Sequence, residues 1–385
     1  MLRALPPYVF AELDRLKLAA RERGQTYVDL GIGSPDIPVA PSIIDALSEA
    51  AKNPATHGYP PFRGVPAYLT AIQRYMDARF GVSIEPATEA LALSGAKEGL
   101  AQVIMSVATA GDVVLVPEIY YPVYARSVWL AGAKVEWIRM RAEDQFALDL
   151  DAIPRDVASR AKAIIVNYPN NPTGARADLA FYERAVAFAR EHSMLLISDL
   201  AYSELVFSGP PAPSALEIDG ARDVTIEFHS FSKTYSMAGF RLGFAVGCGA
   251  AVDALAAYRT NVGYGTPTSV QYAGAYALDH RATLVPPKLE EYRARRDVMV
   301  AAFRDAGWDI TPPPASMYLW LSVPEGIDDW AWVNALLADG VVVTPGVAFG
   351  DGGAGFFRIS LVRDRATLAA AARTIAARRA ALLGR

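Results

Sequence analysis

The sequence has very little cysteine and histidine, and this limits the chemistry that it can support. Cys248 is the single cysteine in 385 residues, so no disulfide can form within the chain, and we expect a reducing compartment. The four histidines show no metal-ligand spacing, and we expect no metal site. A rich metal centre and a disulfide-stabilised fold are therefore excluded.

The chain also lacks a surplus of positive charge and any long apolar segment. Its 37 Lys and Arg residues against 41 Asp and Glu residues give a formal net charge of −4. A chain with this balance has no general attraction for nucleic acid or anionic membranes. No window offers the roughly 20 consecutive apolar residues of a membrane span, and the N-terminus does not have the pattern of a signal peptide. We expect a cytoplasmic protein with no nucleic-acid or membrane partner.

Apolar residues, in contrast, are plentiful enough for a large folded core. They make up 52% of the chain, and charged residues make up 20%, which excludes a disordered or fibrous chain. At roughly 150 residues per domain, the length predicts two domains, with three also allowed.

Between residues 89 and 250, short apolar runs alternate with longer helical segments. The runs are EALALS (89–94), DVVLVP (112–117), KVEWIRM (134–140), AKAIIVN (161–167), MLLISD (194–199), DVTIEFHS (223–230) and LGFAVG (242–247), and the helical segments include 97–108, 121–131 and 179–192. Such alternation is typical of βαβ units. We predict an α/β fold with a mainly parallel, seven-stranded sheet between helices, and a ligand at the carboxyl ends of its strands.

The two ends of the chain have a different pattern. An amphipathic helix over residues 9–23 precedes the Gly/Pro-rich LGIGSPDIPVAP, and a charged helix past about residue 285 precedes TPPPASMYLWLSV, GVVVTP, FFRISLV and a final Ala/Arg-rich helix. Because helices and strands no longer alternate strictly, we predict a smaller α+β domain. The predicted division is a large domain over residues 45–285 and a small domain made of residues 1–44 and 286–385.

The most informative segment is HSFSKTYSMAGFRLGF, at residues 229–244. It places Ser230, Ser232, Lys233 and Arg241 just after an apolar strand. A lysine beside hydroxyls and a guanidinium suits a Schiff base next to a phosphate group, although an ordinary polar loop would have the same pattern. The S-x-x-K motif of serine acyl-enzymes also requires S-D-N and K-T-G, and neither tripeptide occurs here.

Two other predicted strands end in polar residues. Asp199 ends the run MLLIS, with Tyr202 close behind. A half-buried carboxylate there needs a cationic partner such as a protonated ring nitrogen, but a helix cap or turn would also account for it. The segment NYPNNPTG forms a tight turn at a strand end. Asn171 in this turn either presents its amide to a ligand oxygen or has no ligand.

Weaker signals come from single positions. The amides of Ala96 and Lys97 lie at a predicted helix N-terminus, which suits a phosphate group. Tyr121 either stacks on a flat ring or packs in the core. Arg358, inside the apolar FFRIS, binds a carboxylate or forms an internal salt bridge. The G-I-G at residues 31–33 lacks the third glycine of a dinucleotide fingerprint, and we exclude nicotinamide binding.

Together these segments resemble a class I/II aminotransferase, a pyridoxal 5′-phosphate enzyme of fold type I. The resemblance covers nearly the whole chain, through LGIGSPD, THGYPPFRG, SGAKEGL, YYPVY, NYPNNPTG, SDLAY, SFSKTYSMAGFRLGF, ASMYLW, TPGVAFG and FRISL. Within the family, the chain looks most like the alanine (glutamate–pyruvate) aminotransferases and next most like the LL-diaminopimelate aminotransferases.

The resemblance implies a role for each motif residue. Lys233 would be the Schiff-base lysine that moves the proton between Cα and C4′, Asp199 would pair with the pyridinium nitrogen, and Tyr202 would bond the phenolate oxygen. The other implied cofactor ligands are Asn171 at the phenolate oxygen, Tyr121 on the ring, Ala96, Lys97, Ser230, Ser232 and Arg241 at the phosphate, and Tyr59 of the partner subunit. The implied substrate contacts are Arg358 at the α-carboxylate, Gly33, Asn171 and Tyr264.

The implied activity is an amino-group exchange by a homodimer with active sites at its interface. The enzyme would move an α-amino group between an L-amino acid, such as alanine or glutamate, and a 2-oxoacid, such as 2-oxoglutarate or pyruvate, by ping-pong chemistry. The alternatives are an LL-diaminopimelate or aspartate aminotransferase and a C–S β-lyase on the same scaffold. The aminotransferase-like half of a transcription regulator is a further alternative, but the predicted family segments begin almost at once and the chain is acidic.

One departure from the family bears on the substrate. Aspartate aminotransferases of the well-known type carry a second arginine for the distal carboxylate, just ahead of the segment matching residues 264–267. The corresponding place here is Thr260, next to Arg259. We therefore expect no strict specificity for dicarboxylates.

Overall fold

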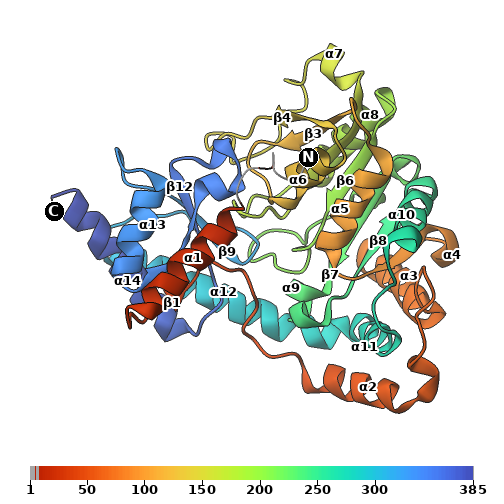
Figure 1. Ribbon diagram of the computed structural model, residues 1–385, viewed down its shortest axis with the longest axis horizontal. Coiled ribbons are helices and arrows are strands. Elements are labelled where there is room, and N and C mark those ends of the chain that lie inside the picture. Colours follow the sequence, from red (N-terminus) through yellow and green to blue (C-terminus); the bar gives the residue numbers. More distant parts are fainter. Residues whose placement is uncertain (1–4, 6–7, 385) are drawn as a thin grey trace.

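A seven-stranded sheet forms the centre of the larger part of the molecule (Figure 1). The computed structural model describes residue 5 and residues 8–384, so Pro6 and Pro7, near the start of the sequence, lie outside the described residues. The strands are β2 (Ala90–Leu93), β3 (Val113–Pro117), β4 (Lys134–Ile138), β5 (Ala161–Asn167), β6 (Leu195–Asp199), β7 (Thr225–Ser230) and β8 (Gly243–Gly247). Their order is β2-β8-β7-β6-β5-β3-β4, and β8 runs antiparallel to both of its neighbours. The predicted, mainly parallel sheet of seven strands is confirmed.

Helices cover both faces of this sheet. One face packs against α5 (Ala96–Val107), α6 (Val123–Leu130) and α10 (Gly249–Val262), and the other against α3 (Pro66–Phe80), α8 (Leu179–Glu191) and α11 (Thr268–Asp279). Alternate side chains of β5 therefore enter different cores, because Ile165 belongs to the first and Ile164 and Val166 to the second. Burial on both faces explains why the central strands read as continuous apolar runs.

A second, smaller part holds two short sheets. One has the order β11-β12-β9, made of β11 (Thr344–Pro345), β12 (Phe356–Ser360) and β9 (Tyr318–Ser322), and in the other β1 (Val28–Asp29) pairs with β10 (Val341–Val342). Three helices surround them, α1 (Val9–Glu22), α13 (Asp329–Ala338) and α14 (Arg365–Leu382). Their apolar faces share one core, to which Leu13, Trp332 and Leu368 all belong. The separate core supports the predicted small domain of residues 1–44 and 286–385, which remains a proposal.

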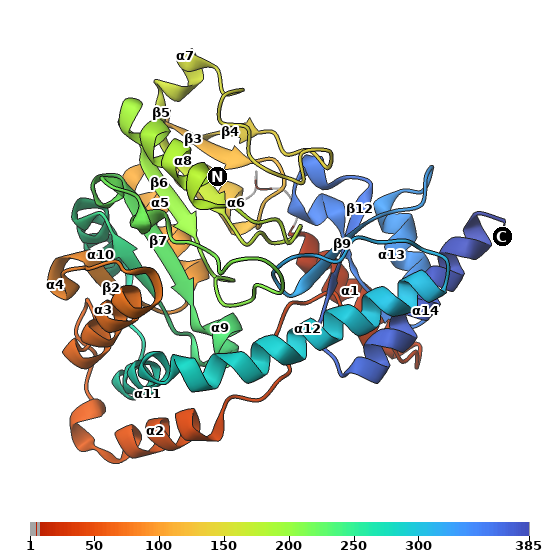
Figure 2. The ribbon, with the colours of Figure 1, turned by 180° about the vertical axis from the view of Figure 1, so that it is seen from behind.

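One long helix joins the two parts, and its start differs from the prediction. The charged pattern predicts a helix past about residue 285, but α12 spans Arg281–Asp305 and contains Pro286 and Pro287. Figure 2 shows it running from α11 to the smaller part. The two prolines lie early in the helix, where each removes one backbone hydrogen bond without ending the helix. The proposed domain boundary therefore falls inside a continuous helix.

Among the residues that the structure describes, four α-helices remain in the larger part. They are α2 (Pro41–Lys52), which packs on α11, and the short α4 (Pro86–Glu89), α7 (Arg155–Ala158) and α9 (Phe231–Thr234). Within the described ranges, no helix has both the length and the apolar character needed to cross a bilayer. The same residues contain no cluster of three or more His, Cys, Asp or Glu side chains that could hold a metal ion.

Candidate active site

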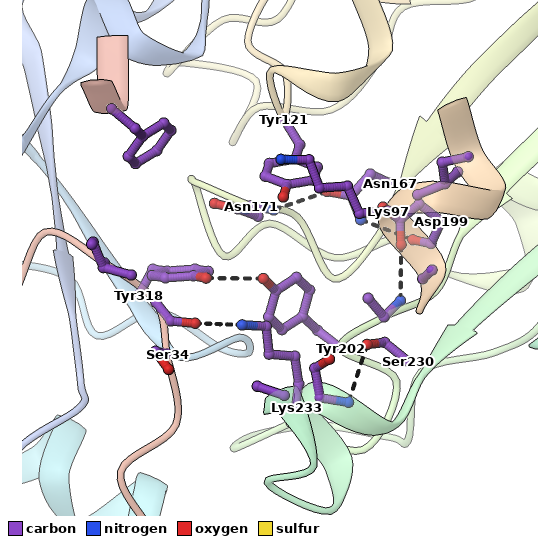
Figure 3. A pocket seen from close by; sticks show the side chains of 18 of the residues that line it. Ser34, Lys97, Tyr121, Asn167, Asn171, Asp199, Tyr202, Ser230, Lys233 and Tyr318 are labelled. Carbon is purple, nitrogen blue, oxygen red and sulfur yellow. Dashed lines mark hydrogen bonds between the residues drawn. The ribbon is translucent and has the colours of Figure 1, made fainter. Parts of the chain in front are cut away.

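A cavity of about 350 Å³ lies where the carboxyl ends of the sheet strands face the smaller part. Every predicted site residue except Tyr59 and Tyr264 lines it. Figure 3 shows how side chains from separate elements converge on this space. The structure therefore brings together residues that are up to 325 positions apart in the sequence, from Gly33 to Arg358.

Lys233 lies on α9, directly after β7. The side chain of Ser230 caps this short helix by accepting a hydrogen bond from the backbone N–H of Ser232 at 3.3 Å. The Nζ of Lys233 donates to the backbone oxygen of Gly33 (Figure 3). Burial, together with the positive charges of Arg358 and Arg241, lowers the pKa of Lys233. A lowered pKa increases the share of neutral amine, which is the form that attacks an aldehyde.

Asp199 ends β6 and is 5% exposed. Its Oδ2 accepts a hydrogen bond from Tyr124 Oη at 2.6 Å, and its Oδ1 accepts one from the backbone N–H of Ala201 at 3.1 Å. Burial raises the pKa of Asp199 to about 6, against the effect of these two bonds. His229 also favours the ionised form through its charge, but no ion pair among the described residues includes Asp199, so this buried carboxylate faces the cavity without a directly bonded cation.

Several hydrogen-bond donors lie near the start of α5. Gly95 precedes this helix with φ 92°, and a Cβ there would lie 2.5 Å from an Nη atom of Arg241, so glycine lets the guanidinium approach. Arg241 donates to the backbone oxygens of Ser94 (3.3 Å) and Ala238 (2.9 Å). The first amides of α5, the guanidinium and the nearby serine hydroxyls form a positively polarised pocket that suits a dianion.

Arg358 lies in β12 and is 2% exposed. Its two Nη atoms donate to Asn171 Oδ1 (2.8 Å) and to the backbone oxygen of Gly31 (2.7 Å), while its Nε has no partner. No carboxylate among residues 5 and 8–384 forms an ion pair with it. The structure therefore gives no support to the predicted alternative of an internal salt bridge at Arg358, since no described carboxylate pairs with it, and its buried guanidinium suits an external carboxylate.

Three further residues of the site were missed by the sequence analysis. Tyr124 donates a hydrogen bond to Asp199. Figure 3 shows the other two: Asn167 Nδ2 donates to the backbone oxygen of Asp199 at 2.8 Å, and Tyr318 Oη lies 2.9 Å from Tyr202 Oη. Each stands in a motif that the family resemblance already used, namely YYPVY, NYPNNPTG or ASMYLW. Their motif positions were the available signal, but which neighbour each one contacts depends on the fold.

Tyr59 and Tyr264 lie away from the cavity. Their side chains are 79% and 55% exposed, and their rings stack with centroids 4.1 Å apart. Phe62 stacks on Tyr264 at 5.8 Å, so the three rings form an exposed aromatic patch. Neither tyrosine contributes to the cavity of its own chain.

The two other arginines considered from the sequence are occupied elsewhere. Arg63 forms an ion pair with Asp253 at 2.7 Å, and the buried Arg259 donates to the backbone oxygen of Ala92. The hydroxyl of Thr260 donates to a backbone oxygen of its own helix. None of these three residues lines the cavity.

The donors present fit pyridoxal phosphate. Lys233 offers an amine for the aldehyde, the uncompensated carboxylate of Asp199 matches a protonated ring nitrogen, and Tyr121 borders the space between them. The pocket at the start of α5 matches the phosphate. A cavity of this size holds both the cofactor and a small substrate.

Comparison with known proteins agrees with this fit. The family model described as aminotransferase class I and II matches residues 25–375. An LL-diaminopimelate aminotransferase from Desulforudis audaxviator is 45% identical over 361 residues, which cover 94% of this chain and 92% of that protein.

Two solved structures are similar over almost their whole length. Apo-BacF from Bacillus subtilis has a TM-score of 0.94 and 36% identity, covering 98% of this chain and 96% of that one. A probable N-succinyldiaminopimelate aminotransferase from Thermus thermophilus has a TM-score of 0.91 and 38% identity, covering 96% and 100%.

Proposed function

This chain belongs to the class I and II aminotransferases, and from that membership we propose that it exchanges an α-amino group between an L-amino acid and a 2-oxoacid with glutamate and 2-oxoglutarate as one pair. It is a pyridoxal-phosphate-dependent enzyme, as its family is. When bound, the cofactor supplies the aldehyde and the electron sink for this exchange.

The residues of the chain have separate tasks in this proposal. The amine of Lys233 binds the cofactor and moves the proton between the substrate Cα and C4′. The carboxylate of Asp199 keeps a proton on the ring nitrogen, and the hydroxyl of Tyr202 donates to the phenolate oxygen. Arg358 orients the substrate by its α-carboxylate, and Asn171, which accepts from Arg358, holds that guanidinium in place.

The observation that carries the proposal is the buried guanidinium of Arg358, which pairs with no described carboxylate and lies in the same cavity as Lys233. A guanidinium with no internal counter-charge is costly to bury, and a bidentate carboxylate offsets that cost. Every α-amino acid and 2-oxoacid carries such a group. The arrangement therefore selects this substrate class before the side chain is considered.

The lining also limits how the substrate side chain is recognised. Its described cationic residues are Lys97, Lys233, Arg241 and Arg358. Lys97 is the one whose side chain has no proposed role at the cofactor or at the α-carboxylate, and its Nζ lies 3.4 Å from Tyr8 Oη and 5.8 Å from the ring centroid of Tyr121. A flexible ammonium binds a distal carboxylate less specifically than an arginine fork.

We therefore propose that glutamate and small neutral amino acids such as alanine are both donors. LL-Diaminopimelate is the second candidate, because relatives 41–45% identical to this chain carry that name. Its distal carboxylate would use the same ammonium of Lys97.

A half-reaction screen tests the proposal. Single amino acids are added to the cofactor-loaded enzyme, and the absorbance of the bound cofactor is followed; alanine, glutamate, aspartate, LL-diaminopimelate and cystathionine form the panel. A true aminotransferase changes its absorbance with a donor and recovers when a 2-oxoacid is added. Release of pyruvate and ammonia from cystathionine without any 2-oxoacid would instead identify the β-lyase alternative.

We further propose a homodimer in which Tyr59 of the partner subunit contacts the cofactor phosphate. The exposed patch of Tyr59, Phe62 and Tyr264 supports this assembly, since exposed aromatic clusters mark interaction surfaces. Sedimentation should show that the wild-type protein is a dimer. Tyr59→Phe should weaken cofactor binding while the protein remains a dimer. A monomeric wild-type protein would refute the assembly.

We also propose a cytoplasmic location, which rests on the single cysteine.

A further inference from the structure

Tyr318 lies between the two ends of the active site. It belongs to β9, is 2% exposed and lines the cavity (Figure 3). Its hydroxyl passes so close to Gly33 that a Cβ at that position would lie 2.1 Å from it. The loop that holds the amine of Lys233 through the backbone oxygen of Gly33 is therefore shaped to admit this hydroxyl.

The first consequence concerns the hydroxyl of Tyr202. The two phenol oxygens are 2.9 Å apart, and either could be the donor. A phenol has one hydrogen, so Tyr202 donates to the cofactor only if it accepts from Tyr318. Burial alone would raise the pKa of Tyr318, but the charges of Lys233 and Arg358, together with the contact to Tyr202, outweigh it and lower that pKa, whereas burial raises the pKa of Tyr202. A more acidic phenol is the better donor, which favours this direction.

The second consequence concerns Arg358. The centre of its guanidinium lies 4.1 Å from the ring centroid of Tyr318, the shortest of its contacts to the aromatic rings around it. A guanidinium stacks on such a ring through cation–π attraction, which fixes its plane. The plane of the guanidinium in turn decides how a carboxylate binds to it.

We propose that Tyr318 is a positioning residue for both ends of the site: its hydroxyl directs the hydrogen of Tyr202 toward the cofactor, and its ring fixes the plane of Arg358. This inference rests on the proposed roles of Tyr202 and Arg358. It separates two functions within one side chain, and substitution can remove them one at a time.

Tyr318→Phe removes the hydroxyl and keeps the ring. The readout is the pH midpoint at which the absorbance of the bound cofactor changes, as the nitrogen that joins it to Lys233 takes up a proton. A hydrogen bond from Tyr202 stabilises the phenolate oxygen most when that nitrogen has no proton. A weaker donor therefore raises the midpoint, by up to about one pH unit for one hydrogen bond. The KM for alanine should change less than about twofold, since the contact of the ring with Arg358 remains.

A double variant shows whether the effect passes through Tyr202. Tyr202→Phe and Tyr202→Phe/Tyr318→Phe should have the same midpoint, because no hydroxyl is left to direct. An unshifted midpoint in Tyr318→Phe, or a further shift in the double variant, would overturn the inference. This titration needs bound cofactor but no turnover. If no amino acid changes the absorbance of the wild-type enzyme, the proposed function fails while the titration still decides the role of Tyr318.

Tyr318→Leu removes the ring as well, and the KM for alanine should then rise about tenfold. An unchanged KM would refute the role at Arg358. Tyr292→Phe is the matched control, because Tyr292 is fully buried in the same core and its hydroxyl has no partner among the described residues. It should leave the midpoint and KM unchanged, and melting temperatures of all variants identify any that fold poorly.

Discussion

The hydroxyl of Tyr124 donates a 2.6 Å hydrogen bond to Oδ2 of Asp199, at the buried end of β6. Tyr124 is itself fully buried on α6, so the contact joins the helix layer to the strand that carries the carboxylate. Burial raises the pKa of Asp199 to about 6, and the bonds from Tyr124 and Ala201 oppose that rise. Tyr124 thus favours the ionised carboxylate that a protonated ring nitrogen requires.

Tyr124→Phe should weaken cofactor binding. A hydrogen bond to a charged group contributes about 1.5–3 kcal/mol, so the Kd for pyridoxal phosphate should rise about tenfold or more at pH 8. An absorbance titration of the cofactor-free protein measures the change, with Tyr292→Phe as the control for loss of a buried hydroxyl. Equal Kd values for wild type and Tyr124→Phe would show that the bond does not support Asp199.

The pH dependence of the cofactor-free protein should reveal Asp199. Its folded pKa of about 6 lies above the ordinary value of 3.8, so the folded chain holds this proton more tightly than the unfolded chain. The resulting stabilisation is complete below pH 3.8 and is lost as the pH rises through about 6. Asp199→Asn has no proton to lose at this position. As the pH rises through this window, the melting temperature of Asp199→Asn should therefore rise relative to that of the wild type.

Saturating cofactor should stabilise the wild type more than Asp199→Asn at neutral pH, since only the carboxylate can balance a charged ring nitrogen. For the pH prediction, the contradicting outcome is that wild type and Asp199→Asn, both free of cofactor, give parallel curves of melting temperature against pH. The pKa of Asp199 would then be the same in the folded and unfolded chains, contrary to its burial.

Lys233→Ala should lose the borohydride-trapped cofactor adduct and the activity. Loss of a general base alone costs about 10²–10⁴ in rate, and loss of the covalent link adds to that. Lys288→Met is the matched control, because Lys288 is also buried, with its pKa lowered to about 8 by burial, but bonds Ser236 outside the cavity. Mapping of the wild-type adduct to any lysine other than Lys233 would contradict the assignment.

Local patterns explain why the sheet and the cofactor residues could be predicted. The runs that end at Asp199 and Ser230 are buried at all but one position each and are flanked by helix-forming segments, so both the strands and their carboxyl ends are visible in sequence. The family motifs then identified Lys233 and Arg241. All of these assignments depend on neighbours within a few residues in the chain.

The contacts of Tyr318 and Tyr124 could not be predicted in this way. Tyr318 meets Tyr202 across 116 positions, and Tyr124 meets Asp199 across 75. Both tyrosines read as ordinary core residues, because the fold alone decides which hydroxyl finds a partner. The start of α12 was missed for the opposite reason: Pro286 and Pro287 are strong local signals against a helix, and packing overrides them.

Arg358→Lys should raise the KM of every substrate together. Lysine keeps the charge but cannot bond Asn171 and Gly31 while presenting a fork to the carboxylate. The expected rise is about tenfold or more, the value of one charged hydrogen bond. Arg63→Lys, at a surface arginine paired with Asp253, should leave the KM values unchanged. A KM rise confined to one substrate would assign Arg358 to the side chain rather than to the α-carboxylate.

The final prediction concerns the choice between alanine and aspartate. Arg259 and Arg63 bond other groups outside the cavity, which leaves the flexible ammonium of Lys97 as the cation for a distal carboxylate. Alanine should therefore have a kcat/KM at least equal to that of aspartate, each measured with saturating 2-oxoglutarate. Lys97→Gln should raise the KM for glutamate and 2-oxoglutarate while changing that for alanine much less, because alanine has no distal charge. A preference for aspartate of about a hundredfold, the discrimination that one well-placed charged hydrogen bond supplies, would contradict this reading. It would require an arginine to reach the site, and loss of the preference in Arg259→Gln or Arg63→Gln would identify which one.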